Sequence, residues 1–314
     1  MNPDYESVQA AAKRIGPFIN HTPVVTSEKL DNIAGCSLFF KCENLQKAGA
    51  FKSRGAVNAI MSLGAPVLAK GVATHSSGNH GAALARAAGL KNTTAYIVVP
   101  DNAKQVKQDA ILSYGGQVIL CEPTLEAREA KLKVVLKETG ATFVHPYDQE
   151  EIIAGQGTAM LELVQQVKGL DIVIVPVGGG GLLAGCGLVA EHEQIKIIGA
   201  EPEGADDACR SVDTGELVLR HTPNTICDGL LTTLGTRNFE IIRDKVDSIL
   251  LVSDQETIRA MSLVWTRMKL IIEPSSAVTL AVVLRNPGLF EGKRVGLLLT
   301  GGNVDLTDLP FKSI

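Results

Sequence analysis

The sequence QKAGAFKSRGA, residues 46–56, places a lysine directly after Gly-Ala-Phe and at the predicted start of a helix. Small residues at 48–50 let the backbone pass close to a flat group, and Phe51 offers a ring face beside it. Amides at a helix start favour a nearby anion and disfavour an ammonium group. Because a lysine nucleophile must lose its proton to react, this setting suits Lys52 as a Schiff-base nucleophile. A lone lysine is usually a surface residue, so the rest of the chain has to decide between the two interpretations.

The composition indicates a soluble globular protein without a nucleic-acid partner. The chain has 314 residues, enough for one large or two ordinary domains, and 45% of them are hydrophobic. Its net charge is -4, it has no basic block, and only 4% of its residues are aromatic, which argues against nucleic-acid binding. Residues 1–6 are acidic and polar, so neither a signal peptide nor a transit peptide is expected.

One uncharged run, residues 172–190, is long enough to raise the question of a membrane span. Pro176 and four glycines at 178–181 interrupt it, so we expect a buried strand, a loop and a helix start, and no membrane partner. The six cysteines form no CxxC pair, and most lie in apolar runs. This pattern favours reduced, buried thiols in a cytoplasmic protein.

From residue 72 onward, apolar strand patterns alternate with helical patterns. The predicted strands are 38–42, 72–75, 94–99, 117–121, 142–144, 172–177, 196–200, 249–252 and 294–299. The predicted helices are 5–18, 28–33, 52–63, 81–88, 103–114, 125–138, 151–167, 182–190, 254–269 and 275–285. Strands as apolar as IVIV at 172–175 belong to mostly parallel sheets that helices cover on both faces.

The pattern predicts an α/β fold with two units. The smaller unit covers residues 71–148, and the larger one combines residues 1–70 with residues 149–314; no linker or repeat marks the join. Open parallel sheets bind ligands beyond the carboxyl ends of their strands. The loops described next fall at such ends.

Four consecutive glycines occupy the loop Val177–Leu182, between a predicted strand and a predicted helix. Successive amide N–H groups in such a loop can converge on a phosphate. The loop lacks the Lys-Ser or Lys-Thr of a Walker motif and the GxGxxG spacing of a dinucleotide site, so a monophosphate is the better interpretation. The simpler interpretation of the four glycines is a tight turn that binds no ligand.

A second loop, His75–Gly81, has the sequence HSSGNHG, again between a strand and a helix. Asn79 can hydrogen-bond a ring hydroxyl or phenolate oxygen, and the loop amides can hold a carboxylate. The hydroxyl of Ser77 can exchange a proton if a neighbour accepts it. His75 and His80 have no carboxylate or cysteine at ligand spacing, so we interpret them as packing residues.

Two further loops close later strands. Thr300, in the sequence LTGGN at 299–303, offers a neutral hydroxyl that would leave a facing pyridine nitrogen unprotonated. Turn chemistry alone explains that sequence equally well. The acidic loop EPEGADD at 201–207 can ligate a hard cation. It can also be a solvated turn.

In combination and order, these stretches resemble the fold-type II pyridoxal-phosphate (PLP) enzymes, specifically the serine racemase and serine/threonine dehydratase family. The stretches are FFKCENLQKAGAFKSRGA (39–56), SSGNHG (76–81), VGGGGLLAG (177–185) and TGGNVDL (300–306). The match spans nearly the whole chain. It implies the two-domain, tryptophan synthase β-like architecture of that family, with mostly parallel twisted sheets and helices on both faces, and a homodimer.

The resemblance implies a role for residues in each loop. Lys52 would form the Schiff base with PLP, between Phe51 on one ring face and Gly229 on the other. The other implied cofactor ligands are Asn79 at the ring oxygen, Gly178, Gly179, Gly180, Gly181 and Leu182 at the phosphate, and Thr300 at the ring nitrogen. The implied substrate-binding residues are Ser76, Ser77, Gly78, Asn79, His80 and Arg128.

Within the family, SSGNHG is typical of serine racemases, whereas many threonine dehydratases carry alanine in place of Ser77. The resemblance therefore implies that Ser77 is the acid/base on the face opposite Lys52, because racemisation needs one group on each face. It also implies that Arg128 lies near the substrate side chain, where it would pair with the second carboxylate of 3-hydroxyaspartate.

The acidic loop matches the divalent-metal site of the racemase branch. The implied ligands are Glu201, Ala205 through its carbonyl, and Asp207. Magnesium, calcium and manganese all accept oxygen ligands, so the choice among the three stays open.

The implied function is that of a PLP-dependent serine racemase with L-serine and L-threonine dehydratase activity, acting on small β-hydroxy amino acids. The alternative is an ammonia-lyase for threonine or threo-3-hydroxyaspartate without physiological racemisation. A β-replacement enzyme of the cysteine-synthase type, whose lysine loop is closer to SVKDR, and a non-enzymatic PLP carrier are further alternatives.

Two departures from the family pattern stand out. Residues 48–50 read Ala-Gly-Ala where relatives often carry hydroxyls, and Ala82 stands where relatives commonly have glutamine. The second departure argues against the nucleotide regulation of animal racemases. The chain ends soon after the last predicted strand, so we expect no regulatory C-terminal domain.

Overall fold

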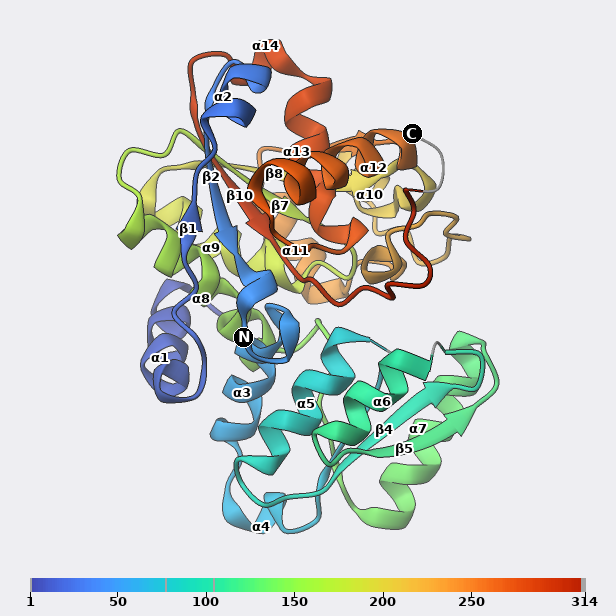
Figure 1. Ribbon diagram of the computed structural model, residues 1–314. Coiled ribbons are helices and arrows are strands. Elements are labelled where there is room, and N and C mark those ends of the chain that lie inside the picture. Colours follow the sequence, from blue (N-terminus) through green and yellow to red (C-terminus); the bar gives the residue numbers. More distant parts are fainter. Residues whose placement is uncertain (1, 77, 104, 312–314) are drawn as a thin grey trace.

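The computed structural model describes residues 2–76, 78–103 and 105–311, which form two sheets (Figure 1). In spatial order, the six-stranded sheet contains β1 (Val24–Val25), β2 (Ser37–Cys42), β10 (Arg294–Leu299), β7 (Ile172–Pro176), β8 (Lys196–Pro202) and β9 (Ser248–Val252). The four-stranded sheet contains β5 (Gln117–Cys121), β4 (Ala95–Pro100), β3 (Val72–His75) and β6 (Thr142–Phe143). Every strand pair is parallel except β1 with β2.

Fourteen α-helices in the described part of the chain surround the sheets. They are α1 (Tyr5–Ile15), α2 (Glu28–Ala34), α3 (Lys52–Ser62), α4 (Ala65–Leu68), α5 (Asn79–Gly89), α6 (Gln105–Ser113), α7 (Leu125–Thr139), α8 (Glu150–Gln166), α9 (Gly181–Glu193), α10 (Asp207–Thr214), α11 (Thr236–Lys245), α12 (Asp254–Leu263), α13 (Pro274–Arg285) and α14 (Pro287–Phe290).

Hydrophobic cores lie on both faces of the large sheet. All five residues of β7 are buried. Val173 and Val175 belong to the core beneath α8, α9 and α11, whereas Ile172 and Ile174 belong to the core beneath α12 and α13. Successive side chains of a strand point to opposite faces, so one apolar strand serves both cores. This confirms the predicted parallel sheet covered by helices on both sides.

The small sheet is covered in the same way. Helix α5 lies on one face and α7 on the other (Figure 1). All four strands fall within the predicted smaller unit, residues 71–148. Helix α3 precedes that unit in the chain, yet its Val57 and Ile60 share a core with Leu84 of α5. The domain boundary near residue 70 therefore stays a prediction.

The predicted helices and strands are confirmed, except that one helix ends early and that four helices were not predicted. The helix expected at 254–269 ends as an α-helix at Leu263, and a π-helical segment, Val264–Met268, follows it. Lys269 then turns the chain with a φ of 59°, and the Trp265 indole donates to the Ile272 carbonyl across the turn, at 3.0 Å. Helices α4, α10, α11 and α14 were not predicted: α4 and α14 have only 4 residues each, and the sequences of α10 and α11 are mostly polar. No described helix is long and apolar enough to cross a membrane.

Candidate active site

The lysine loop meets the end of β10 at the carboxyl edge of the large sheet. Ala50 pairs with Gly301 in an isolated antiparallel bridge, and the Phe51 N–H donates to the Thr300 carbonyl at 2.9 Å. Helix α3 begins at Lys52 immediately after this contact. The two predicted loops, 46–56 and 299–303, therefore lie side by side, as expected for loops that follow neighbouring parallel strands.

Lys52 has the properties of a lysine that can lose its proton. Its Nζ donates to the Pro146 carbonyl at 2.9 Å and lies 5.1 Å from the centre of the Phe51 ring. Burial lowers the pKa of Lys52 from 10.5 to about 8, and the nearby Glu273 carboxylate opposes that shift. The hydrogen-bond partner is a neutral backbone carbonyl, so among the described residues no carboxylate is hydrogen-bonded to the ammonium form.

Two partners fix the amide of Asn79, the first residue of α5. Its Nδ2 donates to Glu273 Oε1 at 2.9 Å, and its Oδ1 accepts a hydrogen bond from Asn303 Nδ2 at 2.9 Å. Asn303 Nδ2 also donates to the Ala48 carbonyl at 2.9 Å. These contacts connect the 75–81 loop with the lysine loop and with the end of β10, as the sequence analysis requires.

Glu273 is a site residue that sequence reasoning missed. It precedes α13, is 4% exposed, and its Oε1 would lie only 2.6 Å from a Cβ on Gly301. Burial, together with the charge of Asp228, raises the pKa of Glu273 to about 7. The available signal was a glutamate in the sequence IIEPSSA (271–277), between an apolar pair and a predicted helix start.

Thr300 lies in a neutral environment. Its Oγ1 is 3.0 Å from the hydroxyl of Ser276, and both residues are buried. The Ser276 Oγ also donates to the Gly301 carbonyl and accepts from the Gly301 N–H, each at 2.8 Å. Among the described residues, no carboxylate is bonded to the Thr300 hydroxyl, and its role at a ring nitrogen stays a prediction.

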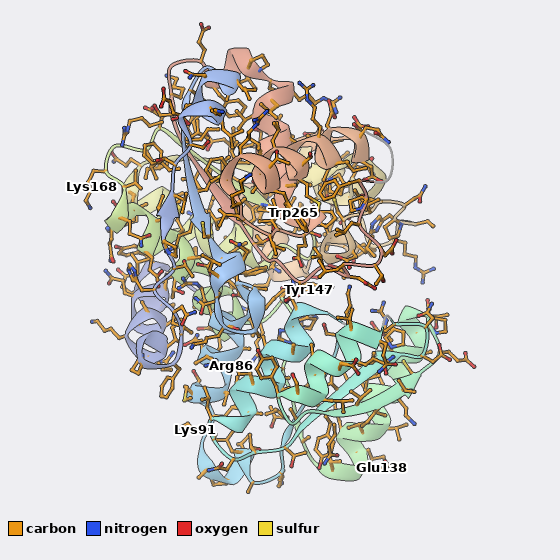
Figure 2. All side chains as sticks on the ribbon, viewed as in Figure 1. Arg86, Lys91, Glu138, Tyr147, Lys168 and Trp265 are labelled. Carbon is orange, nitrogen blue, oxygen red and sulfur yellow. The ribbon has the colours of Figure 1, made fainter. Side chains whose placement is uncertain are left out.

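The glycine loop connects β7 to the start of α9. Gly180 has a φ of 89°, which only glycine adopts without strain. A Cβ on Gly179 would lie 2.4 Å from the ring of Tyr147, which sits where the two units meet (Figure 2). Within the described chain, the N–H groups of Gly178, Gly179 and Gly180 donate to no other residue. They follow one another at a helix N-terminus, which is the arrangement that binds phosphate.

Two of the remaining cofactor predictions lie close to this loop. Leu182 is buried in the first turn of α9. Gly229 lies in a short 3-10 turn, Asp228–Leu230, and its N–H donates to the hydroxyl of Ser275 at 3.0 Å. A Cβ on Gly178 would approach Leu230 Cα to 2.9 Å, so this turn packs directly on the glycine loop.

The predicted substrate loop lies at the N-terminus of α5. Gly78 is the N-cap, and its N–H donates to Ser76 Oγ at 3.4 Å. His80 is buried, and burial lowers its pKa well below the usual range, so the ring is neutral. Ser77 lies outside the described residues.

Arg128 lies in the first turn of α7, where its Nε donates to the Thr124 carbonyl at 3.4 Å. Burial and the charge of Arg128 lower the pKa of His75. Arg128 therefore lies on the His75 side of the site, within electrostatic reach of the predicted substrate loop.

The acidic segment 201–207 begins in the last two residues of β8, and its two predicted carboxylate ligands are buried. Glu201 accepts from the N–H groups of Ala208 and Cys209 at 3.0 and 2.9 Å, and burial raises its pKa to about 9. Asp207 accepts from the Leu234 N–H at 3.0 Å. The described residues contain no group of three or more His, Cys, Asp or Glu side chains arranged for a metal. The predicted set needs the Ala205 carbonyl as a third ligand, so it stays a prediction.

Comparisons with known proteins agree with this geometry. Residues 15–301 match the family model described as "Pyridoxal-phosphate dependent enzyme". The chain is 50% identical to a serine racemase of Dictyostelium discoideum, over 97% of this chain and 96% of the relative. It is 48% identical to a β-hydroxyaspartate dehydratase of Paracoccus denitrificans, over 98% and 99%. The solved structure of maize serine racemase superposes with a TM-score of 0.96 at 42% identity, covering 98% of this chain and 95% of that one.

The residues present fit pyridoxal phosphate. The cofactor needs an amine that can deprotonate, donors for a phosphate and a neutral or charged partner for its ring nitrogen. Lys52, the N–H groups of the glycine loop and the Thr300 hydroxyl supply these at one edge of one sheet. The chain therefore belongs to the serine racemase and serine/threonine dehydratase family of fold-type II pyridoxal-phosphate-dependent enzymes.

Proposed function

We propose that this protein is a PLP-dependent serine racemase that also dehydrates L-serine and L-threonine. The observation that carries the proposal is Lys52, a buried amine with a pKa lowered to about 8, at the edge where the glycine loop and Thr300 also lie. High identity to a serine racemase and to a β-hydroxyaspartate dehydratase over nearly the full chain supports the same reaction classes.

Each protein group has a separate task. When bound, pyridoxal phosphate stabilises the negative charge that forms at the α-carbon of the substrate. The glycine loop and Leu182 would hold its phosphate, Phe51 and Gly229 would enclose its ring, and Asn79 would donate to its ring oxygen. The Thr300 hydroxyl, bonded to Ser276, would leave the ring nitrogen unprotonated and so favour loss of the β-hydroxyl.

Proton transfer requires groups on two faces of the substrate. Lys52, with its lowered pKa, would remove the α-proton of the L-substrate. Ser77 would return a proton from the opposite face and so produce the D-enantiomer. If the β-hydroxyl instead takes up a proton and leaves as water after that deprotonation, a second water hydrolyses the unsaturated product to a keto acid and ammonia.

The substrate carboxylate would bind at the N-terminus of α5. Asn79 and His80 are the first residues of α5, so their backbone N–H groups lie at that end, and the helix dipole favours an anion there. The neutral His80 ring adds no competing charge. Arg128, on the His75 side, would contact a second carboxylate, which favours the alternative of a threo-3-hydroxyaspartate ammonia-lyase.

Product analysis tests the proposal. PLP-loaded protein with magnesium is supplied separately with L-serine, L-threonine and L-threo-3-hydroxyaspartate, and keto acid and D-enantiomer are quantified in the same sample. We expect D-serine together with pyruvate from L-serine. Keto acid alone, formed fastest from L-threonine or L-threo-3-hydroxyaspartate, would replace the racemase with the ammonia-lyase for that substrate.

We also propose a divalent cation held by Glu201, the Ala205 carbonyl and Asp207, in a cytoplasmic homodimer. Burial raises the pKa of both carboxyl groups, and Asp207 Oδ1 is buried with the His221 Nε2 at 3.4 Å but without a hydrogen bond from another described residue. A cation would relieve the cost of ionising both groups in one buried place.

The cation predicts a ligand-dependent melting temperature. Magnesium at about 100 times its dissociation constant is expected to raise the melting temperature by about 5 °C, because binding to the folded state stabilises it. Glu201→Gln should abolish the rise, and Glu203→Gln, an exposed residue of the same loop, should keep it. No shift with magnesium, calcium or manganese, or a full shift in Glu201→Gln, would contradict the site.

A further inference from the structure

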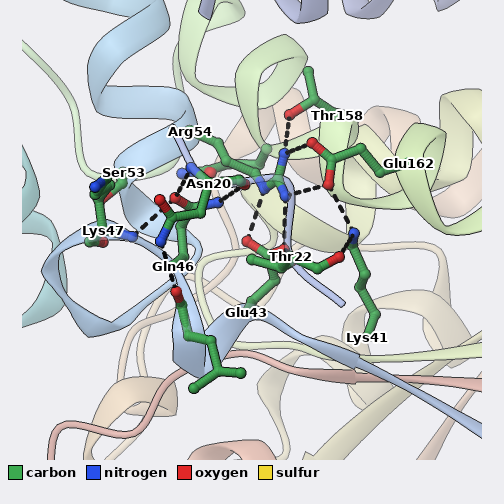
Figure 3. Close-up of polar contacts among 12 residues, drawn as sticks. Asn20, Thr22, Lys41, Glu43, Gln46, Lys47, Ser53, Arg54, Thr158 and Glu162 are labelled. Atoms are coloured by element: carbon green, nitrogen blue, oxygen red, sulfur yellow. Dashed lines mark hydrogen bonds and ion pairs between the residues drawn. The ribbon is translucent and has the colours of Figure 1, made fainter. Parts of the chain in front are cut away.

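Arg54 lies two residues after Lys52 on helix α3, and its side chain is fully buried. Its Nε and Nη2 donate to the two oxygens of Glu43, each at 2.7 Å. Its Nη1 and Nη2 donate to the two oxygens of Glu162, each at 2.8 Å, and Nη1 also donates to Thr158 Oγ1 at 3.2 Å. A guanidinium has five N–H donors, so every one of them is used (Figure 3).

The contacts continue beyond Arg54 in a closed network. Lys41 Nζ donates to Glu162 Oε2, to the Thr22 carbonyl and to Gln166 Oε1, at 2.7, 2.8 and 2.9 Å. Glu43 also accepts from the Thr22 hydroxyl at 2.6 Å. The network therefore contains two cations, Lys41 and Arg54, and two carboxylates, Glu43 and Glu162. Their charges balance, and every N–H donor of the two cations has an acceptor.

The start of α3 has little local support of its own. Its N-cap residue, Phe51, makes no side-chain cap, and Ala48 has a φ of 55°, which is unusual for a residue with a Cβ. Ser53 Oγ donates to the Lys47 carbonyl, and Gln46 exchanges hydrogen bonds with the backbone of Asn20 at 2.8 Å (Figure 3). Side-chain hydrogen bonds to the backbone of the lysine loop and of Asn20, not helix capping, hold this turn.

We propose that Arg54 and Glu43 are positioning residues for Lys52. Lys52 and Arg54 are two apart in the first turn of α3, so they point to different sides of the helix. The planar guanidinium of Arg54 hydrogen-bonds two carboxylates at once. These bonds fix the rotation of the first turn of α3 about the helix axis, and its position along that axis, more strictly than apolar packing does. The amine on the other side is thereby held at the Pro146 carbonyl. This proposal rests on the proposed function, because it names what places the catalytic amine.

A role limited to stability is the competing explanation. Buried ion pairs often contribute little net stability, whereas removing one partner destabilises the protein strongly. Loss of activity in an Arg54 variant therefore proves nothing unless stability is matched. The network provides a control: Lys41 is equally buried and shares Glu162 with Arg54, yet it lies on β2, and its hydrogen bonds go to Thr22, Glu162 and Gln166 and not to α3.

The experiment compares Arg54→Lys with Lys41→Met, each loaded with PLP. Arg54→Lys keeps the charge but loses the fork, so a misplacement of Lys52 is expected; shifts of 1 Å can cost about 10²-fold in rate. We expect kcat of Arg54→Lys to fall about tenfold or more with KM within about threefold. The pH midpoint of the bound cofactor's visible absorbance should move by about half a unit or more. Each variant is assayed the same number of degrees below its own melting temperature. Under that condition, Lys41→Met should keep the kcat and the absorbance midpoint of the parent protein.

Equal changes of kcat and absorbance midpoint in the two variants, or no change in Arg54→Lys, would overturn the proposal. If Arg54→Lys does not fold, Glu43→Gln replaces it, because it keeps the shape of the side chain but removes the charge and one of the two acceptor oxygens that face Nε and Nη2 of Arg54. The absorbance midpoint is measured without substrate. This test can therefore be carried out even if the protein does not racemise serine, and the two failures can be told apart.

Discussion

Lys52→Ala is expected to abolish both racemisation and dehydration, with a loss of about 10⁴-fold or more, as for other residues that carry a covalent step. The reason is that Lys52 supplies the amine that bonds the cofactor and also the base that removes the α-proton. Its pKa, lowered to about 8 by burial, is what makes both tasks feasible near neutral pH. Turnover of L-serine, and retention of cofactor after borohydride reduction and denaturation, would be measured together.

Lys47→Ala is the matched control for that prediction. Lys47 lies in the same loop, and its side chain is exposed. The loop uses only its backbone, through the hydrogen bonds to Gln46 and Ser53. Activity in Lys47→Ala should stay within about threefold of the parent protein. Residual racemisation in Lys52→Ala above one-hundredth of the parent rate would show that another group removes the α-proton.

Ser77→Ala is expected to stop racemisation and to spare dehydration of the L-substrate. A positioned acid or base contributes about 10²–10⁴-fold, so D-serine formation should fall at least about 100-fold. Pyruvate formation from L-serine needs only the Lys52 face and should change by less than about threefold. The two products are measured in one sample, so pyruvate serves as the internal control for folding and cofactor content.

The opposite result has a clear meaning. D-serine formed at the parent rate by Ser77→Ala would remove the two-base mechanism and leave the reprotonating group unassigned. Equal losses of D-serine and pyruvate would assign Ser77 to substrate binding, in line with its place in the loop before α5.

The sequence predicted the sheets well because their signal is local. Runs such as Ile172–Pro176 are apolar on both faces, and that is visible without any tertiary information. The glycine loop and Lys52 were recognisable for a similar reason, since their chemistry depends on residue types next to one another. The structure then places Lys52, Asn79 and Thr300 in one connected region, as the strand-end argument requires.

The features that could not be predicted from the sequence depend on contacts between residues far apart in the chain. The acceptor for Lys52 is the backbone carbonyl of Pro146, 94 positions away, and a carbonyl leaves no trace in residue identity. Glu273 reaches Asn79 across 194 positions. Arg54 stood inside the motif that was analysed first, but its partner Glu162 is 108 positions away. Only the fold shows that its charge points into the protein.

The pH dependence of cofactor capture tests the central claim, that Lys52 is a buried amine with a lowered pKa, most directly. Only the uncharged amine attacks the cofactor's aldehyde, so the capture rate of the cofactor-free protein rises with pH until the amine has lost its proton. With a pKa of about 8, the rate should rise about tenfold per pH unit below that value and level off above it. A rate that keeps rising through pH 10, as for an ordinary lysine with a pKa of 10.5, would contradict the claim.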